Sequence, residues 1–280
     1  MQRAGPALPH NAHKGQAGRV ALLVGSRWMR GAATLACRAA ARGGAGLVVH
    51  LARDDETASQ VFLTVPECVV LDCSERVDYN VAGALAQRAP HALVAGCGLS
   101  ADAFTQRMVE ASLSFDGPLV LDADALNVLA DRSECLRARR APTVLTPHPL
   151  EAERLLGAAV GASDAARLAA AQELARRTGA LVVLKGAGTL VVEGTRTWRC
   201  QHGTPAMAKA GMGDVLAGLL GACLARTVSY PVAGWDAYAA TCSAVERHAL
   251  AGVLAERDLS PNGVLASDLT ERLPAAERHP

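Results

Sequence analysis

Short runs of Val, Leu and Ala alternate with segments of helical periodicity through the first two thirds of the chain, and this alternation restricts the fold more than any other feature. Strands of a parallel sheet that is covered on both faces read as continuous apolar runs. The predicted strands are 19–25, 45–52, 91–98, 118–124, 142–147 and 180–186. The predicted helices are 31–44, 101–113, 125–131, 149–157 and 163–178. The pattern predicts an α/β fold of three layers, with a mostly parallel central sheet and helices on both faces.

The last third of the chain departs from this alternation. Residues 186–202 read as two short strands joined at Glu193-Gly194, which predicts an antiparallel hairpin at one edge of the sheet. From residue 214 onward the chain is helical, with one long helix predicted over 231–256. The sheet should therefore end in a hairpin, and the closing helices should pack on it.

Length and composition limit the number of domains. The chain has 280 residues, half of them apolar but only 3% aromatic, so one core of small aliphatic side chains is expected. Residues 1–10 contain two prolines and little that could pack, and we expect a loose arm there. No linker, charge block or repeat interrupts 11–275, which we expect to form a single domain.

Charge and cysteine usage exclude several classes of partner. Lys plus Arg number 28 against 27 Asp plus Glu, so there is no electrostatic reason to expect nucleic acid or an anionic membrane as a partner. The eight cysteines form no C-x-x-C pair, which favours reduced thiols over disulfides or a protein metal site. The N-terminus lacks a signal-peptide stretch, and no run approaches 18 apolar residues. We expect a soluble, cytoplasmic protein.

Candidate site residues follow the predicted strands, because ligands of an open parallel sheet bind beyond the carboxyl ends of its strands. The segment "AGMGD" places Asp214 behind two glycines at the start of a helix. Glycines allow backbone N–H groups to form an anion-binding nest, and a carboxylate there can accept a hydroxyl proton. The alternative is that Asp214 only caps the helix.

Three other segments carry titratable groups. "KGAGT" places Lys185 at a strand end as a point charge for phosphate, or else as a solvated residue of a hairpin turn. "TPHPLE" fixes His148 before a helix whose first turn contains Pro149, and a lone histidine is more often structural. "LDADALN" offers Asp122 and Asp124, either of which could cap the next helix.

Seven ordered segments, "NAHKGQAGRVALLVGS", "GAATLACRAAARGGAGLV", "AGCGLS", "LDADALN", "TPHPLEAERLL", "LKGAGTLVV" and "GTPAMAKAGMGDVLAGLLGACLA", resemble the ADP-dependent NAD(P)H-hydrate dehydratase family over about residues 11–255. The resemblance implies a ribokinase-like fold. It also implies a metabolite-repair reaction in which ADP, or ATP in some relatives, activates the C6 hydroxyl of the hydrated cofactors NADHX and NADPHX. Phosphate then leaves, and NADH or NADPH is restored with release of AMP or ADP.

The resemblance also implies roles for particular residues. Asp214 is the catalytic base and contacts the hydrate, and the other expected hydrate-binding residues are Ala32, Gly98 and His148. The expected nucleotide-binding residues are Lys185, Gly186, Ala187, Gly188, Thr189 and Gly213. Met212 stands where the family usually has threonine, so we expect weaker nucleotide binding than a hydroxyl there would give.

The resemblance sets expectations for cofactors and partners as well. ADP or ATP is the co-substrate, with Mg²⁺ as its counterion, and we expect a homo-oligomer. About ten residues precede the "NAHKG" segment, so we expect no fused epimerase domain and cooperation with a separate NAD(P)H-hydrate epimerase. Two alternatives stay open: a vitamin-precursor kinase of the same fold, because the superfamily shares the Gly-x-Gly-Asp loop, and a non-catalytic nucleotide-binding protein, which Met212 suggests.

Overall fold

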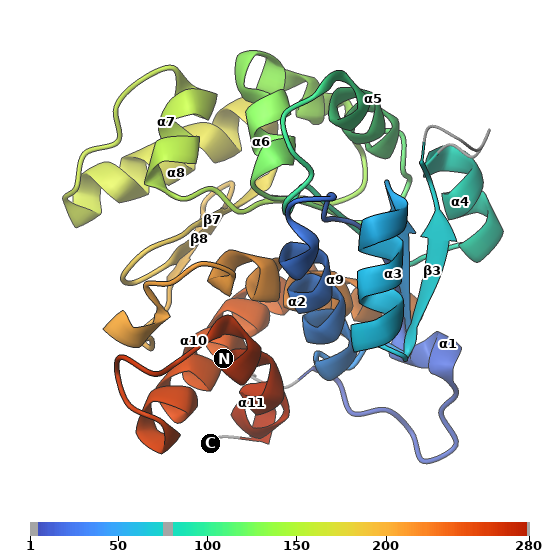
Figure 1. The fold of residues 1–280 in the computed structure, drawn as a ribbon. Coiled ribbons are helices and arrows are strands. Elements are labelled where there is room, and N and C mark those ends of the chain that lie inside the picture. The colour runs from blue at the N-terminus through green and yellow to red at the C-terminus, as the bar shows by residue number, and fades with distance from the viewer. Residues whose placement is uncertain (1–4, 75–80, 279–280) are drawn as a thin grey trace.

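A mixed sheet with helices on both faces forms the protein (Figure 1). The structure, a computed structural model, describes residues 5–74 and 81–278. Within these residues the sheet has the strand order β3-β2-β1-β4-β5-β6-β7-β8-β9, parallel from β3 through β7 and antiparallel from β7 to β9. The strands are β1 Arg19–Leu23, β2 Leu47–Ala52, β3 Cys68–Asp72, β4 Ala92–Ala95, β5 Leu119–Leu121, β6 Thr143–Leu145, β7 Leu181–Leu184, β8 Leu190–Glu193 and β9 Arg196–Arg199. The predicted fold class is confirmed, including the antiparallel edge.

Two layers of helices cover the sheet (Figure 1). One apolar cluster joins the sheet to α2, α3, α9, α10 and α11, and a second joins the opposite face to α4 through α8. The α-helices are α1 Lys14–Ala17, α2 Arg30–Arg42, α3 Asp55–Thr64, α4 Val81–Arg88, α5 Ala103–Ser112, α6 Asp124–Val128, α7 Pro149–Leu156, α8 Asp164–Thr178, α9 Met212–Ser229, α10 Ala237–Asp258 and α11 Ala266–Arg278. Two 3₁₀ segments, η1 Ala130–Ala138 and η2 Pro205–Met207, complete the elements.

Each face of the sheet takes alternate residues of a strand, as the two-residue period of a strand requires. In β1, Val20 and Leu22 belong to one apolar cluster, whereas Ala21 and Leu23 belong to the other. Both sets are buried, which explains why the strand reads as one unbroken apolar run.

Several predicted bounds need correction at the ends of strands and helices. The strands end earlier than predicted because the glycines that follow them leave the extended conformation: φ is +81° at Gly25, +127° at Gly96 and +132° at Gly186. The long C-terminal helix begins at Ala237 rather than 231, because the side chain of Asp236 accepts a hydrogen bond from Ala239 N and caps it there.

Residues 53–90 were assigned no element from the sequence, yet the structure places α3, β3 and α4 there, with 75–80 outside the described residues. Strand β3 pairs only with β2 and is partly exposed, although its sequence, Cys-Val-Val-Leu-Asp, begins with a continuous apolar run. So short a run does not by itself distinguish a strand from a buried segment of helix.

Helix α9 packs against both α2 and the central strands, and it carries Asp214 in its first turn. A Cβ atom at Gly218 would lie 2.0 Å from the carbonyl oxygen of Ala36, so the two helix backbones touch at this glycine. Within the described residues α9 is the one helix long and apolar enough to cross a membrane, but 67% of that segment is buried inside the fold, as in the core helix of a globular domain.

Candidate active site

The first turn of α9 presents free backbone donors. Gly211, with φ +87°, precedes the helix, and no side chain caps it. The N–H groups of Met212, Gly213 and Asp214 therefore lie in the first turn without a side-chain acceptor, at the positive end of an 18-residue helix. Asp214 stands in the third helical position and does not cap. The capping alternative for Asp214 is wrong, and the geometry is that of an anion-binding nest.

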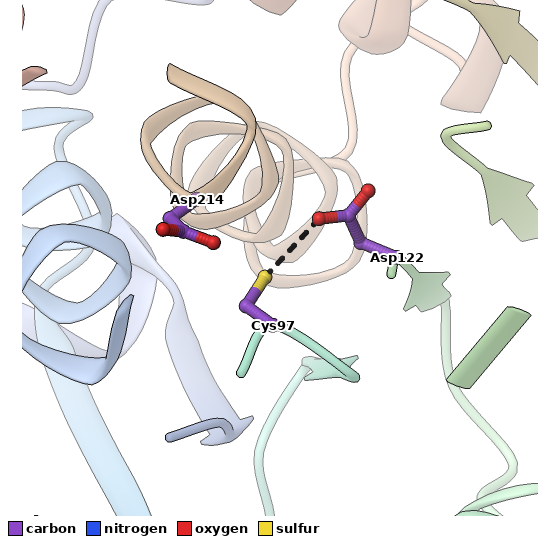
Figure 2. A group of neighbouring side chains, drawn as sticks. All are labelled: Cys97, Asp122 and Asp214. Carbon is purple, nitrogen blue, oxygen red and sulfur yellow. Dashed lines mark hydrogen bonds between the residues drawn. The ribbon is translucent and has the colours of Figure 1, made fainter. Parts of the chain in front are cut away.

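Asp214 lies close to two other polar side chains (Figure 2). Ligand atoms of Cys97, Asp122 and Asp214 all lie within 4.8 Å of one another. Burial, and then the negative charge of Asp122, raises the pKa of Asp214 from 3.8 to about 6, against the opposing effects of Lys185 and Cys97. A carboxylate with this pKa is a stronger base than an exposed aspartate and is still ionised at neutral pH.

Asp122 is the anchor of the cluster. Its carboxylate, 2% exposed, accepts hydrogen bonds from Lys185 Nζ at 2.8 Å and Thr146 Oγ1 at 2.6 Å, and from Cys97 Sγ at 3.4 Å. Burial alone would raise the pKa of Asp122, but the Lys185 ammonium and these hydrogen bonds outweigh it and hold the pKa below its usual value. Asp122 therefore stays ionised, and its charge contributes to the raised pKa of Asp214.

Lys185 lies next to the Asp122 carboxylate and begins the segment expected to bind nucleotide. It follows β7, and its Nζ lies 2.8 Å from Asp122 Oδ1 and 3.7 Å from Glu151 Oε2. A Cβ atom at Gly213 would lie 3.4 Å from Nζ, so the ammonium also adjoins the nest. Burial lowers the pKa of Lys185, but Asp122 and Glu151 outweigh it and raise the pKa above its ordinary value. Residues 185–189 do form the loop of the β7–β8 hairpin, but the alternative of a solvated lysine in that loop is wrong.

A pocket of about 810 Å³ opens beside the nest and the lysine. All of the residues expected to bind nucleotide line it: Lys185, Gly186, Ala187, Gly188, Thr189 and Gly213. Its remaining wall comes from the end of β9 and the loop after it, and from η2, α9 and α10, and it is partly apolar, with Met207, Leu216, Val245 and Ala249. The volume and the mixed lining suit a nucleotide, with phosphates at the lysine and the base against the apolar wall.

The expected hydrate side adjoins the Asp214 cluster through Cys97. A Cβ atom at Gly98 would lie 2.8 Å from the Cβ of Ala32, so these two expected hydrate contacts are neighbours. Gly98 has φ +62° and directly follows Cys97, whose Sγ belongs to the Asp214 cluster. Burial, with Asp122 and Asp214, raises the pKa of the Cys97 thiol far above its usual range, so this thiol stays protonated.

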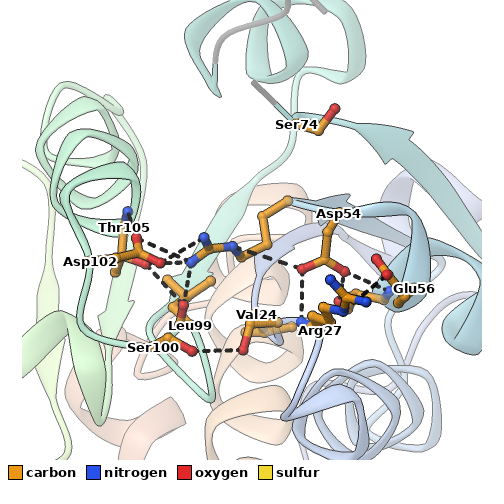
Figure 3. A network of polar contacts seen from close by, with 12 residues as sticks. Val24, Arg27, Asp54, Glu56, Ser74, Leu99, Ser100, Asp102 and Thr105 are labelled. Atoms are coloured by element: carbon orange, nitrogen blue, oxygen red, sulfur yellow. Dashed lines mark hydrogen bonds and ion pairs between the residues drawn. The ribbon is translucent and has the colours of Figure 1, made fainter. Parts of the chain in front are cut away.

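A polar network holds the loop that carries Gly98 (Figure 3). Arg53, which follows β2, donates to the carbonyl of Leu99, to Thr105 Oγ1 at 2.7 Å and to Asp102 Oδ2 at 2.8 Å. The next loop residue, Ser100, contacts Ser26 through their hydroxyls at 2.9 Å. Loops after three strands are thus tied together, and the backbone of Gly98 is held in place.

His148 lies where the sequence placed it but has a structural partner. It precedes α7; its Nδ1 accepts from Glu151 N at 3.3 Å, and its own N donates to Glu151 Oε2 at 2.8 Å. This is a reciprocal capping arrangement. The side chain remains 42% exposed, so contact with the hydrate stays a prediction.

Sequence reasoning missed three contributors to the site. Glu151 is buried between His148 and Lys185, Cys97 donates to Asp122, and His248 contacts the carbonyl of Met212 through Nε2 at 2.9 Å. Burial lowers the pKa of His248 to about 4, so it is neutral and fixes the start of α9. Cys97 and Glu151 stand inside the motifs "AGCGLS" and "TPHPLE", which was the signal available for them, and nothing in the sequence singles out His248.

Met212 itself is nearly buried. Its side chain is 6% exposed and belongs to the core cluster, although it also borders the pocket. The effect of a threonine hydroxyl at this position stays a prediction.

Comparison with solved structures identifies the fold. A ribokinase-like superfamily protein of Enterococcus faecalis, 24% identical, superposes with a TM-score of 0.80 over 99% of this chain and 92% of that chain. The ADP/ATP-dependent NAD(P)H-hydrate dehydratase of Bacillus subtilis, co-crystallised with ATP/Mg²⁺, gives 0.84 at 29% identity, covering 98% of this chain and 94% of that chain. The protein thus has the ribokinase-like fold, as expected.

The family follows from sequence comparison. The NAD(P)H-hydrate dehydratase family model matches residues 20–275. The ADP-dependent (S)-NAD(P)H-hydrate dehydratase of Neisseria meningitidis is 37% identical over 94% of this chain and 86% of its own length. The bifunctional NAD(P)H-hydrate repair enzyme of Vibrio cholerae is 38% identical over 93% of this chain, but the chain spans about half, 50%, of that relative. The chain belongs to the NAD(P)H-hydrate dehydratase family, and the assignment made from its motifs is confirmed.

Proposed function

We propose that this protein restores NADH and NADPH from their hydrates NADHX and NADPHX, using ADP or ATP. The observation that carries the proposal is the position of Asp214. This carboxylate of raised pKa directly follows Gly213 of the pocket lining and clusters with Cys97, which directly precedes Gly98, the neighbour of Ala32. The relative from Neisseria meningitidis is ADP-dependent and the one from Bacillus subtilis is ADP/ATP-dependent, which supports the choice of nucleotide.

The first step would transfer the terminal phosphoryl group to the C6 hydroxyl of the hydrate. Asp214 accepts the hydroxyl proton while the oxygen forms its bond to phosphorus, and the bond to the bridging oxygen breaks to release AMP or ADP. The free N–H groups at the start of α9 and the Lys185 ammonium face the charge on the phosphate oxygens.

The second step would eliminate phosphate from the ring. The phosphorylated oxygen sits on the carbon next to the ring nitrogen, so the nitrogen lone pair can expel phosphate. Loss of a proton from C5 then restores the dihydropyridine double bond. The protein's contribution is to hold the ring against Ala32 and Gly98 while phosphate leaves into the nest.

Part of the Cys97–Asp122–Asp214 cluster is suited to hold Mg²⁺. The carboxylates of Asp122 and Asp214 are oxygen ligands of the kind Mg²⁺ prefers, but the third member of the cluster, the Cys97 thiol, is not. Because the oxygens of Asp122 already accept from Lys185, Thr146 and Cys97, Mg²⁺ would be held by nucleotide phosphates with Asp214 as the nearest available carboxylate. When bound, it would neutralise phosphate charge.

The proposal extends to the setting of the reaction. The name of the Neisseria relative specifies the (S)-hydrate, so we expect an epimerase to supply that isomer from the (R)-hydrate. A homo-oligomer is proposed, to be checked by light scattering. The eight cysteines are free thiols, and all but Cys135 are buried, which supports a reducing, cytoplasmic location.

One assay separates this function from its rivals. Purified protein is supplied with (S)-NADHX and ADP, ATP or neither, and reduced cofactor and free phosphate are measured together. The dehydratase yields both in equal amounts and only with nucleotide. Accumulation of a phosphorylated substrate would instead identify a small-molecule kinase, and nucleotide binding without turnover would identify a non-catalytic protein.

The pKa of Asp214 predicts the pH dependence of the reaction. The base must be ionised, so kcat/KM should be level above pH 7 and fall about tenfold per pH unit below about 6. Initial rates between pH 5 and 8.5, corrected for acid decay of the hydrate, measure this. A level profile down to pH 5 would contradict the assignment of the base.

A further inference from the structure

A histidine–carboxylate pair lies at the wall of the nucleotide pocket. His202, which follows β9, lines the pocket, and its Nδ1 lies 2.6 Å from Oε1 of Glu246 on α10. Nδ1 makes no hydrogen bond of acceptable geometry, so this is a close electrostatic contact between the ring and the carboxylate. The negative charge of the carboxylate favours the ring tautomer that carries its proton on Nδ1, the nitrogen nearer to it.

Glu246 is itself fixed in place. Its side chain is 9% exposed, and Cys200 Sγ donates to Oε2 at 3.3 Å. Burial raises the pKa of Cys200 to about 12, so the thiol remains protonated and keeps donating. This contact orients the carboxylate, which in turn faces Nδ1 of His202.

The second ring nitrogen of His202 remains available. Across residues 5–74 and 81–278, no hydrogen bond or ion pair to Nε2 is found. With the proton on Nδ1, Nε2 is a hydrogen-bond acceptor at the wall of the pocket. A bound ligand can satisfy it by donating an N–H or O–H group.

The position of His202 and Glu246 at the pocket suits the base of a nucleotide rather than its phosphates. The phosphate end is set by Lys185 and Gly213, which adjoin each other. Glu246 instead follows Val245, part of the apolar wall, along α10. A purine ring is the apolar part of a nucleotide and suits this wall, whereas the negative charge of Glu246 would repel phosphate.

We propose that Nε2 of His202 accepts a hydrogen bond from the 6-amino group of adenine, so that the site selects 6-amino over 6-oxo purine nucleotides. A 6-oxo purine presents a carbonyl oxygen at the same place, and two acceptors then face each other without a proton between them. The inference rests on the proposed function only in requiring that the pocket bind a nucleotide.

The test compares ADP with inosine diphosphate, which differs from ADP in carrying oxygen instead of the amino group at position 6. Calorimetric titration of the wild-type protein should show ADP binding at least about tenfold more tightly. In His202→Leu, the affinity for ADP should fall to within about threefold of the affinity for inosine diphosphate. The affinity for inosine diphosphate should not change. His10→Leu is the matched control, because it removes an exposed histidine that does not line the pocket and should keep the wild-type ratio.

A second variant tests the direction of the hydrogen bond. In Glu246→Gln the amide can donate to Nδ1, which moves the ring proton to Nε2 and should shift the ratio toward inosine diphosphate. Thermal melts check that each variant is folded. Equal weakening of both ligands in His202→Leu, or a wild-type ratio near one, would overturn the proposal. Because binding needs no turnover, these outcomes are independent of whether the protein dehydrates NADHX.

Discussion

Asp214→Asn is expected to lower the dehydration rate by at least about 100-fold, because an amide cannot accept the hydroxyl proton. The same substitution should make the protein more stable. Burial and Asp122 raise the pKa of Asp214 from 3.8 to about 6, so ionising it in the folded state costs about 2–3 kcal/mol. Steady-state rates at pH 7.5 and urea melts of both proteins measure the two effects.

The sign of the stability effect can be checked against pH. The folded protein keeps the Asp214 proton up to about pH 6 and the unfolded chain loses it near 3.8, so this penalty grows between these values as pH rises. The stability gain of Asp214→Asn should therefore be full at pH 8 and small at pH 4. Exposed Asp131→Asn is the control and should change neither quantity. A variant that keeps more than about a tenth of the rate, a loss below about 1.4 kcal/mol, would exclude Asp214 as the base.

Lys185→Met is expected to cost about 3–5 kcal/mol of unfolding free energy, because it leaves the buried carboxylates of Asp122 and Glu151 without their cation. Without the ammonium, the pKa of Asp122 should rise, so the variant should regain stability as pH falls from 8 to 5. Urea melts at three pH values measure this. The control is Arg132→Met, which breaks an exposed ion pair with Glu110 and should cost less than about 1 kcal/mol.

The same lysine is expected to bind nucleotide phosphate, and a double variant separates that role from stability. Lys185→Met with Asp122→Asn removes both members of the 2.8 Å pair, so much of the lost stability should return. Nucleotide binding should stay weak, and should be impaired more than hydrate binding. Wild-type nucleotide affinity in the folded double variant would show that Lys185 serves only the carboxylates.

The layers of the fold could be predicted because buried parallel strands are apolar on both faces, as Val20 and Ala21 show. The grouping of Lys185 to Thr189 at one pocket could be predicted too, since they follow a strand in a recognisable motif, and their contact with nucleotide stays a prediction. The edge strand β3 could not, because its short apolar run does not by itself distinguish a strand from a buried segment of helix.

The ion-pair network could not be read from the sequence for a different reason. Asp122, Glu151 and Lys185 follow β5, β6 and β7, which are adjacent in the sheet. The sequence indicates where each strand ends, but the order of the strands decides which ends meet. Asp122 therefore looked like one of two helix caps, although the structure gives it a buried lysine as partner.

The contact between Gly218 and the carbonyl oxygen of Ala36 has an evolutionary consequence. Because a methyl group at position 218 would stand 2.0 Å from that oxygen, even the smallest side chain would push α9 away from α2. These two helices carry Asp214 and Ala32, one on each side of the proposed reaction centre. A substitution at Gly218 is therefore not expected to be neutral, although this residue lies a full helical turn from Asp214. A lineage could change it only together with a compensating shift in the backbone of α2.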